Sequence, residues 1–133
     1  MSQSNVEIVR GALEAFTRGD MAAALGPVDP AVEIYPPVED PDMDDVYRGH
    51  EGARRYLEQW LEPWEEFQFE AEELIDAGDQ VVVTYRQRGR GKGSGIEVEN
   101  TLAAVATMRD GKVIRGRVYL DRAAALEAAG LRE

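Results

Sequence analysis

The feature of this sequence that most limits its fold is a change of periodicity about halfway along the chain. From residue 67 onward, segments rich in β-branched, aromatic or alternating apolar residues follow one another. We predict strands at 67–75, 80–88, 96–108 and 112–120. Gly78-Asp79 and Asp110-Gly111 supply turn residues between neighbours, and the glycine-rich segment 89–95 forms a longer connection. Strands joined in this way pair antiparallel.

Helical signals come before these strands. A capping-box pattern at Ser4 and Glu7 precedes apolar residues at helical spacing, and Gly19 ends that run. Asp20 can cap a short second helix. A third helix is expected to carry an apolar stripe that includes Trp60. The helices expected after the first span 21–25, 50–64 and 121–129, and a short strand is expected at 32–35.

Helices placed ahead of an antiparallel meander indicate an α+β fold class rather than a parallel α/β one. A long twisted sheet curls, and the helices then fill only part of its concave face. The sequence therefore predicts a single domain over residues 1–133, in which a curled antiparallel sheet wraps around the N-terminal helices and leaves one pocket. This pocket is expected to end at Asp121.

Composition excludes several classes of site and partner. The chain has no cysteine, which rules out disulfides, thiolate metal sites and cysteine nucleophiles. Its net charge of -11 repels phosphate backbones, so no nucleic acid partner is expected. Neither a signal peptide nor an apolar run of membrane-spanning length is visible. We therefore expect a cytoplasmic protein with no membrane contact.

An acidic segment has the spacing of a calcium-binding EF-hand loop but lacks its turn. The residues at ligand spacing are Asp40, Asp42, Asp44 and Glu51. Asp45 occupies the position of the invariant glycine, and prolines rather than a helix precede the loop. We predict no metal site here, but a solvated loop over the mouth of the pocket.

Two further motifs argue against a cofactor. The glycines of 89–95 resemble a phosphate-binding loop in composition only, because no Gly-Lys-Ser or Gly-Lys-Thr precedes a helix there. His50 is the only histidine, which excludes multi-histidine zinc or iron sites and suggests a surface or capping role for this residue. The sequence therefore predicts no cofactor.

The last strand carries the most informative polar pattern. Alternation puts Arg115, Arg117, Tyr119 and Asp121 on one face of this strand. Inside an apolar cavity the row would orient a polar ligand, and an enclosed carboxylate would be suited to act as a general base. On the outside it would be a solvated face. Asp121 also directly precedes an alanine-rich helix, where aspartate is a common N-cap, so both uses of this carboxylate stay open.

Aromatic residues outside the last strand are further candidates for ligand contact. Trp60 lies on the apolar stripe of its helix, which favours a core position over a stacking platform, although it can also line a cavity. Tyr35, at the end of the short strand, is a candidate hydrogen-bond donor.

Four motifs together carry a resemblance to a known family. They are Phe16-Thr-Arg-Gly-Asp20, Tyr47-Arg-Gly-His-Glu-Gly52, Arg109-Asp-Gly-Lys112 and Arg117-Val-Tyr-Leu-Asp121. With them the chain resembles the SnoaL-like family of the nuclear transport factor 2-like superfamily over nearly its whole length. The resemblance implies a cone-shaped α+β barrel with one pocket, commonly dimerising through the outer face of the sheet.

The resemblance implies a pocket but leaves its chemistry open, because the superfamily includes cyclases, isomerases, dehydratases, epoxide hydrolases and non-catalytic binding domains. In the cyclases the aspartate that ends the last strand acts as acid and base, and its position corresponds to Asp121. The assisting histidine of the cyclases has no match on 96–108. The Arg-x-Asp pair of the epoxide hydrolases is replaced by Arg86-Gln87-Arg88, which rejects water activation of that type.

The resulting hypothesis is a pocket for a small hydrophobic or carbonyl-containing molecule. Asp121 is its candidate acid/base residue, and Tyr119 or Tyr35 its hydrogen-bond donor. The candidate ligand contacts are Tyr35, Trp60, Arg117 and Tyr119. The alternative is a non-catalytic ligand-binding or dimeric interaction domain. A homodimer is expected because the apolar residues of 80–88 occur on both faces of that strand, which suits a sheet covered on both sides.

Overall fold

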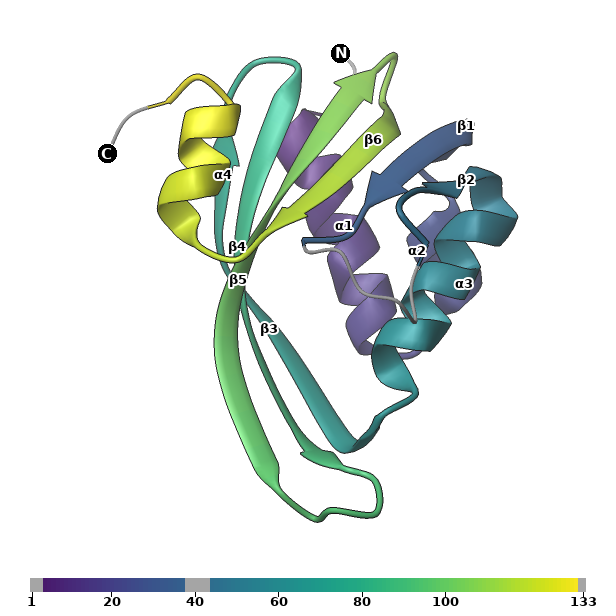
Figure 1. The fold of residues 1–133 in the computed structure, drawn as a ribbon. Helices are drawn as coiled ribbons and strands as arrows, with labels where there is room; N and C mark the ends of the chain where they lie inside the picture. The colour runs from purple at the N-terminus through teal and green to yellow at the C-terminus, as the bar shows by residue number, and fades with distance from the viewer. Residues whose placement is uncertain (1–3, 38–43, 132–133) are drawn as a thin grey trace.

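The computed structural model describes residues 4–37 and 44–131. Its elements follow the chain as α1 (Asn5–Thr17), α2 (Met21–Leu25), β1 (Val28–Tyr35), β2 (Tyr47–Arg48), α3 (Gly49–Leu61), β3 (Trp64–Asp76), β4 (Gln80–Gly91), β5 (Glu97–Arg109), β6 (Lys112–Tyr119) and α4 (Arg122–Ala128). The predicted α+β fold class is confirmed, with a curled six-stranded sheet and helices against both of its faces (Figure 1). None of the described helices has the length and apolarity needed to cross a membrane.

Side-chain caps fix the starts of the first two helices. The Ser4 hydroxyl accepts a hydrogen bond from the Glu7 amide at 3.2 Å. The Asp20 carboxylate accepts one from the Ala23 amide at 3.1 Å. Each cap satisfies an amide that has no partner inside the helix, so both predicted helix starts are confirmed.

The third helix is shorter than predicted. α3 ends at Leu61 and the chain enters β3 at Trp64, so the expected helix to residue 64 is wrong at its C-terminal end. Pro63 explains the stop, because proline has no amide hydrogen with which to continue the helical hydrogen bonds. The Trp64 indole packs on Gly89 of β4, where an added Cβ would lie 3.0 Å from the indole Cε3. Trp64 therefore belongs to the sheet.

The sheet joins the predicted meander to two further strands, of which β1 was predicted in part and β2 was not predicted. Its strand order is β2-β1-β6-β5-β4-β3. β3 to β6 form the predicted antiparallel meander. β1 begins at Val28, earlier than the predicted residue 32, and pairs parallel with β6, while β2 pairs with β1. Because β2 and β3 are the two edges of the described sheet and do not pair with each other, the sheet curls without closing.

The hairpin formed by β4 and β5 extends beyond the helices (Figure 1). β4 continues to Gly91, so the connection predicted at 89–95 is partly strand. Every residue from 92 to 101 is exposed. This arm of the sheet is therefore held mainly by contacts between its own strands.

The two faces of the sheet pack against different helices. On the inner face, which we define as the face against α1 and α3, Val81 and Val83 pack with Val9. On the outer face, Val82 packs with Ala125 and Leu126 of α4. β4 is thus buried on both sides by helices of its own chain, which accounts for the two-sided apolar pattern of 80–88 without a partner.

Candidate functional site

The polar row predicted on the last strand lies on the outer face of the sheet. Val118 of β6 packs inward beside Tyr56 of α3. Arg117 and Tyr119, its neighbours in the strand, therefore face outward, as does Arg115. Tyr119 packs near α4. The row is a partly solvated surface and is not enclosed by the helices.

Asp121 follows this row and caps the last helix. Its carboxylate accepts a hydrogen bond from the Ala124 amide at 2.8 Å, and the residue is exposed. This is the capping arrangement considered from the sequence. This contact does not test catalysis, so the acid/base role of Asp121 stays a prediction.

Tyr35 and Arg117 meet on the same outer face. The guanidinium carbon of Arg117 lies 4.4 Å from the centre of the Tyr35 ring. The Tyr35 hydroxyl donates to Glu33 at 3.1 Å, and Glu33 also pairs with Arg48 and Arg115. Hydrogen bonds from Tyr35 and Arg48 hold the pKa of Glu33 below its ordinary value. These contacts connect β1, β2 and β6, and their arrangement is explained by sheet pairing alone.

Trp60 is the one predicted contact residue that lies against the inner face. Its indole Nε1 donates to Oε1 of Gln87 at 2.8 Å. Its ring centre lies 5.5 Å from that of Phe16, 6.5 Å from that of Tyr56 and 6.0 Å from that of Tyr85. The four candidate ligand contacts therefore do not converge, because Trp60 is separated by the sheet from Tyr35, Arg117 and Tyr119.

Three polar residues collect around Trp60, and we call them the inner polar cluster: Tyr56, Tyr85 and Gln87. Their exposed fractions are 9%, 6% and 7%. Tyr85 and Gln87 share the inward parity of β4, and Tyr56 reaches them from α3. Beside them, the Tyr47 hydroxyl donates to Gln59 and accepts a hydrogen bond from the Asp44 amide at 3.1 Å. The contact region between α3 and β4 is therefore aromatic but carries polar atoms.

Three of these polar atoms have no partner within residues 4–37 and 44–131. Neither the Tyr56 hydroxyl nor the Tyr85 hydroxyl makes a hydrogen bond there, and the Nε2 amide group of Gln87 makes none. Among the described residues, every side-chain nitrogen or oxygen that is completely buried has a hydrogen-bond partner. Each of the three atoms therefore keeps a small contact with solvent.

The raised pKa values of the two tyrosines keep their hydroxyls protonated, so both hydroxyls can donate hydrogen bonds. Burial raises the pKa of Tyr56 to about 12, with a smaller contribution from Tyr47. Burial also raises the pKa of Tyr85, with a smaller contribution from Tyr56. Both phenols are consequently protonated at neutral pH. The inner polar cluster itself contains no carboxylate and no imidazole.

A sequence signal for this cluster exists in the alternation of β4. Alternation puts Val81, Val83 and Tyr85 on one face of their strand, and the same alternation continues to Gln87. A polar residue that extends an apolar face is a candidate for a buried functional group. Tyr56 gives no such signal, because the sequence does not distinguish it from the apolar residues on the stripe of its helix.

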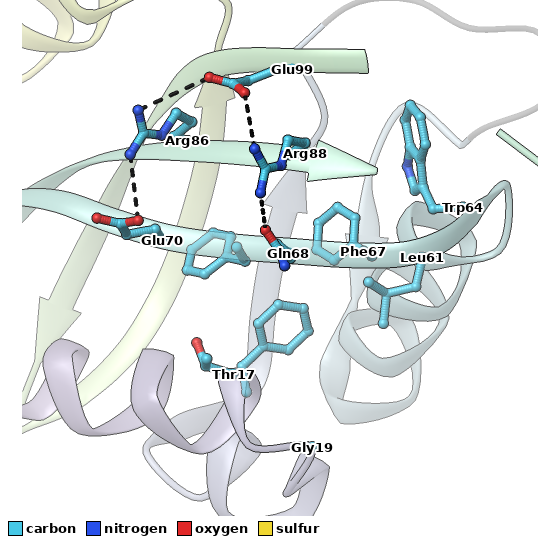
Figure 2. Close-up of a pocket in the computed structure, with 12 residues that line it drawn as sticks. Thr17, Gly19, Leu61, Trp64, Phe67, Gln68, Glu70, Arg86, Arg88 and Glu99 are labelled. Atoms are coloured by element: carbon cyan, nitrogen blue, oxygen red, sulfur yellow. Dashed lines mark hydrogen bonds and ion pairs between the residues drawn. The ribbon is translucent and has the colours of Figure 1, made fainter. Parts of the chain in front are cut away.

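An open groove of about 810 Å³ runs around the free edge of β3 (Figure 2). Phe67 and Phe69 face inward from β3, while Gln68 and Glu70 face outward, and all four line the groove. Since both faces of the strand contribute, the groove must pass around the strand edge. It does not include Asp121, so the expected pocket ending at Asp121 is not this groove.

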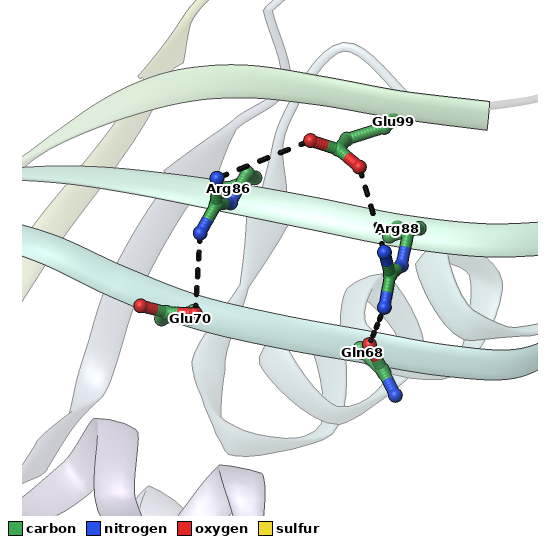
Figure 3. A network of polar contacts seen from close by, with 5 residues as sticks. All are labelled: Gln68, Glu70, Arg86, Arg88 and Glu99. Carbon is green, nitrogen blue, oxygen red and sulfur yellow. Dashed lines mark hydrogen bonds and ion pairs between the residues drawn. The ribbon is translucent and has the colours of Figure 1, made fainter.

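Charged side chains form a ladder across the outer face of the arm (Figure 3). Arg86 of β4 pairs with Glu70 of β3 at 3.4 Å and with Glu99 of β5 at 4.0 Å. Arg88 pairs with Glu99 at 3.8 Å and donates to Gln68 at 2.8 Å. Because these side chains are about half exposed, each pair contributes little alone. Together they connect β3, β4 and β5 in a part of the outer face that none of the described helices covers.

The remaining motifs of the sequence do not form a site. Asp40 and Asp42, from the acidic segment that was predicted to be a solvated loop rather than a metal site, lie outside the described residues. His50 is exposed, and its Nε2 hydrogen-bonds to the Val28 carbonyl. Within the described part of the chain, no three histidine, cysteine, aspartate or glutamate side chains gather as metal ligands.

Comparison with solved structures identifies the fold. An NTF2-like protein from Burkholderia thailandensis is 27% identical, with a TM-score of 0.81, and 97% of each chain is covered. TerC, co-crystallised with polyporic acid, is 24% identical with a TM-score of 0.77 and coverage of 95% of this chain and 98% of TerC. A protein of unknown function with a cystatin-like fold from Xanthomonas campestris is 19% identical, with a TM-score of 0.77 and coverage of 98% of this chain and 100% of that protein.

The sequence comparisons agree with this fold. Among curated proteins, none matches the chain significantly. The model of the SnoaL-like domain matches residues 9–116, a span that runs from α1 to β6 and includes the whole inner polar cluster. The chain therefore belongs to the SnoaL-like family.

Proposed function

We propose that this chain binds a small, mainly apolar molecule carrying a carbonyl or other hydrogen-bond-accepting oxygen against the inner face of its sheet. The observation that carries the proposal is the set of nearly buried, unpaired donors on Tyr56, Tyr85 and Gln87. A bound acceptor oxygen would give these donors a hydrogen-bond partner within the protein. A site of this kind is useful only with a ligand in it.

The surroundings of the donors suit an aromatic ligand. The rings of Trp60 and Tyr85 pack edge to face with their centres 6.0 Å apart, and an aromatic ligand could extend this set of contacts. The donors are protonated and have no carboxylate among them, which favours neutral or anionic ligands over cations. TerC was co-crystallised with polyporic acid, so that compound belongs in the first set of probes.

Acid/base catalysis by Asp121 is the more specific part of the functional hypothesis. In that role the carboxylate would have to exchange a proton with a ligand while it is exposed and bonded to the Ala124 amide. We therefore propose binding as the primary activity, with catalysis as a separate prediction that has its own test.

Calorimetric titration with a matched ligand pair tests the binding proposal. A naphthoquinone carries carbonyl oxygens, and naphthalene has the same ring frame without them. We expect the quinone to bind more tightly. Tyr85→Phe and Gln87→Leu should each weaken the quinone about three- to tenfold, which corresponds to one lost hydrogen bond, and should leave naphthalene unaffected.

Tyr35→Phe is the control, because it removes a tyrosine hydroxyl from the outer face, where Tyr35 bonds to Glu33. It should bind both compounds as the unmodified protein does. Equal affinity for the quinone and the hydrocarbon, or an effect of Tyr35→Phe as large as that of Tyr85→Phe, would contradict the proposal.

The homodimer also stays a proposal. The sequence argument for it was that apolar residues occur on both faces of 80–88. The outward one, Val82, is covered by α4 in the same chain. What still supports a dimer is the family, in which pairing through the outer face is common. Light scattering decides the question, since a monomeric mass over a range of concentrations would reject it.

A further inference from the structure

The free edge of β3 offers main-chain groups to a partner. β3 is an edge strand of 13 residues, and no described strand pairs with its far side. Its pairing with β4 is irregular between Glu65 and Gln68 and again between Ala71 and Glu73. The stretch from Gln68 to Ala71 between these irregularities is regular. An extended segment can add to such a stretch as a further strand.

Two grooves meet on this regular stretch. The groove of about 810 Å³ shown in Figure 2 runs from the stretch toward the end of α3. A second groove of about 680 Å³ runs the other way, between α1 and β3. Both are lined by Thr17, Phe69 and Glu70. They therefore form one continuous surface along the edge strand, with the C-terminal half of α1 as its other wall, and we call this surface the edge groove.

One end of the edge groove is apolar. Phe16, Leu61, Trp64 and Phe67 line it there. Phe67 is partly exposed and its ring centre lies 5.3 Å from that of Trp60, so it presents a ring to the groove while it rests on the core. A large apolar side chain of a bound segment would find aromatic surface here.

The uncompensated charge of the edge groove is negative. Each arginine that lines it has an acidic partner: Arg10 pairs with Glu7, Arg18 with Asp20, and Arg86 and Arg88 with Glu99. Glu14 and Glu72 also line the groove, and among the described residues neither has an ion pair. A bound segment with basic residues would neutralise these carboxylates.

We propose that the edge groove binds an extended peptide segment that pairs with β3 at Gln68 to Ala71. Its apolar side chain rests against Phe67 and Trp64, and its basic residues lie beside Glu14 and Glu72. This activity is independent of ligand binding at the inner polar cluster. The competing view is that the acidic side chains and strand irregularities only protect the edge from pairing, which is a common use of such features.

Fluorescence anisotropy with a labelled peptide of alternating lysine and phenylalanine residues separates the two views. The control peptide carries glutamate in place of lysine. We expect the lysine peptide to bind and the glutamate peptide not to bind. The double variant Glu14→Lys with Glu72→Lys should weaken the lysine peptide about three- to tenfold, the effect of two exposed ion pairs. Glu127→Lys, a single charge reversal on exposed α4, should have little effect.

Hydrogen exchange measured with and without the lysine peptide gives an independent readout. Strand addition should slow exchange of amides between residues 68 and 71, whereas loose electrostatic attraction should slow none of them. The proposal is overturned if the peptide does not bind, if it binds without protecting this stretch, or if the Glu14→Lys and Glu72→Lys double variant binds it unchanged.

Discussion

The indole Nε1 of Trp60 donates a hydrogen bond to Oε1 of Gln87 at 2.8 Å, across the space between α3 and β4. The bond uses the acceptor of the Gln87 carboxamide and leaves its amide hydrogens unpaired in the described structure. It also fixes the position of the most connected ring of the core, which contacts Phe16, Tyr56 and Tyr85. One contact thus supports the fold and orients a candidate donor for the ligand.

Gln87→Leu should lower the free energy of unfolding by about 1–2 kcal/mol, because it leaves the mostly enclosed indole N–H without an acceptor. Urea denaturation measures the loss. The double variant Trp60→Phe with Gln87→Leu removes both partners, so its loss should be smaller than the sum of the two single losses. Additive losses would show that the bond contributes nothing.

Tyr56→Phe and Tyr85→Phe should change stability by less than about 0.5 kcal/mol, because neither hydroxyl has a partner to lose among residues 4–37 and 44–131. Tyr47→Phe is the matched control. Its hydroxyl bonds to Gln59 and to the Asp44 amide, so this variant should lose about 1 kcal/mol. Urea denaturation at neutral pH compares the three variants, and a large loss for Tyr85→Phe would show that its hydroxyl is already paired.

Alkaline conditions should destabilise the protein through Tyr56. Its pKa is raised by burial from 10.0 to about 12 in the folded state. Above pH 10 the unfolded chain releases this proton while the folded chain retains it, so stability falls as pH rises from 10 to 12. A shift of this size corresponds to about 2–3 kcal/mol. Denaturation at several pH values checks the slope, and Tyr56→Phe should reduce it while leaving the contribution of Tyr85, whose pKa burial also raises.

Gly89→Ala should destabilise the arm of the sheet by about 1 kcal/mol, because the new Cβ would lie 3.0 Å from the Trp64 indole and force it to move. Gly11→Ala is the control. A Cβ at Gly11 meets nothing within 4 Å, and alanine is the better residue inside a helix, so this variant should gain about 0.5–1 kcal/mol. Thermal unfolding followed by circular dichroism distinguishes the two directions.

Substitution of Asp121 separates its two possible uses. Asp121→Ala should cost about 1 kcal/mol by removing the cap on α4, whereas asparagine is an equally good cap and Asp121→Asn should keep near-normal stability. If Asp121 is also the acid/base residue, Asp121→Asn should bind a carbonyl ligand but lose any turnover of it. Full turnover by this variant would exclude the catalytic role.

The sequence was most informative where structure is determined locally. The ends of helices and strands can be predicted from the caps Ser4 and Asp20 and from the turns at Gly78 and Gly111. These residues act on backbone groups only a few residues away. The parallel pairing of β1 with β6 brings together segments far apart in the chain, and no local pattern specifies such a pairing.

The site was harder to predict for a related reason. Alternation along β6 separates Arg117 and Tyr119 from Val118 but cannot say which set faces the helices. That choice follows from where α3 and α4 pack, which depends on the whole fold. The same alternation along β4 would have identified Gln87, because Val81 and Val83 already mark the inward side of that strand.

Trp60 and Trp64 are the two tryptophans of the chain. They lie close together in sequence but sense different surroundings, since Trp60 contacts the inner polar cluster and Trp64 lines the edge groove. The protein therefore carries two native optical reporters. With Trp64→Phe the remaining emission should respond to an aromatic ligand, and with Trp60→Phe it should respond to a peptide on β3, so occupancy of each surface can be followed without a label.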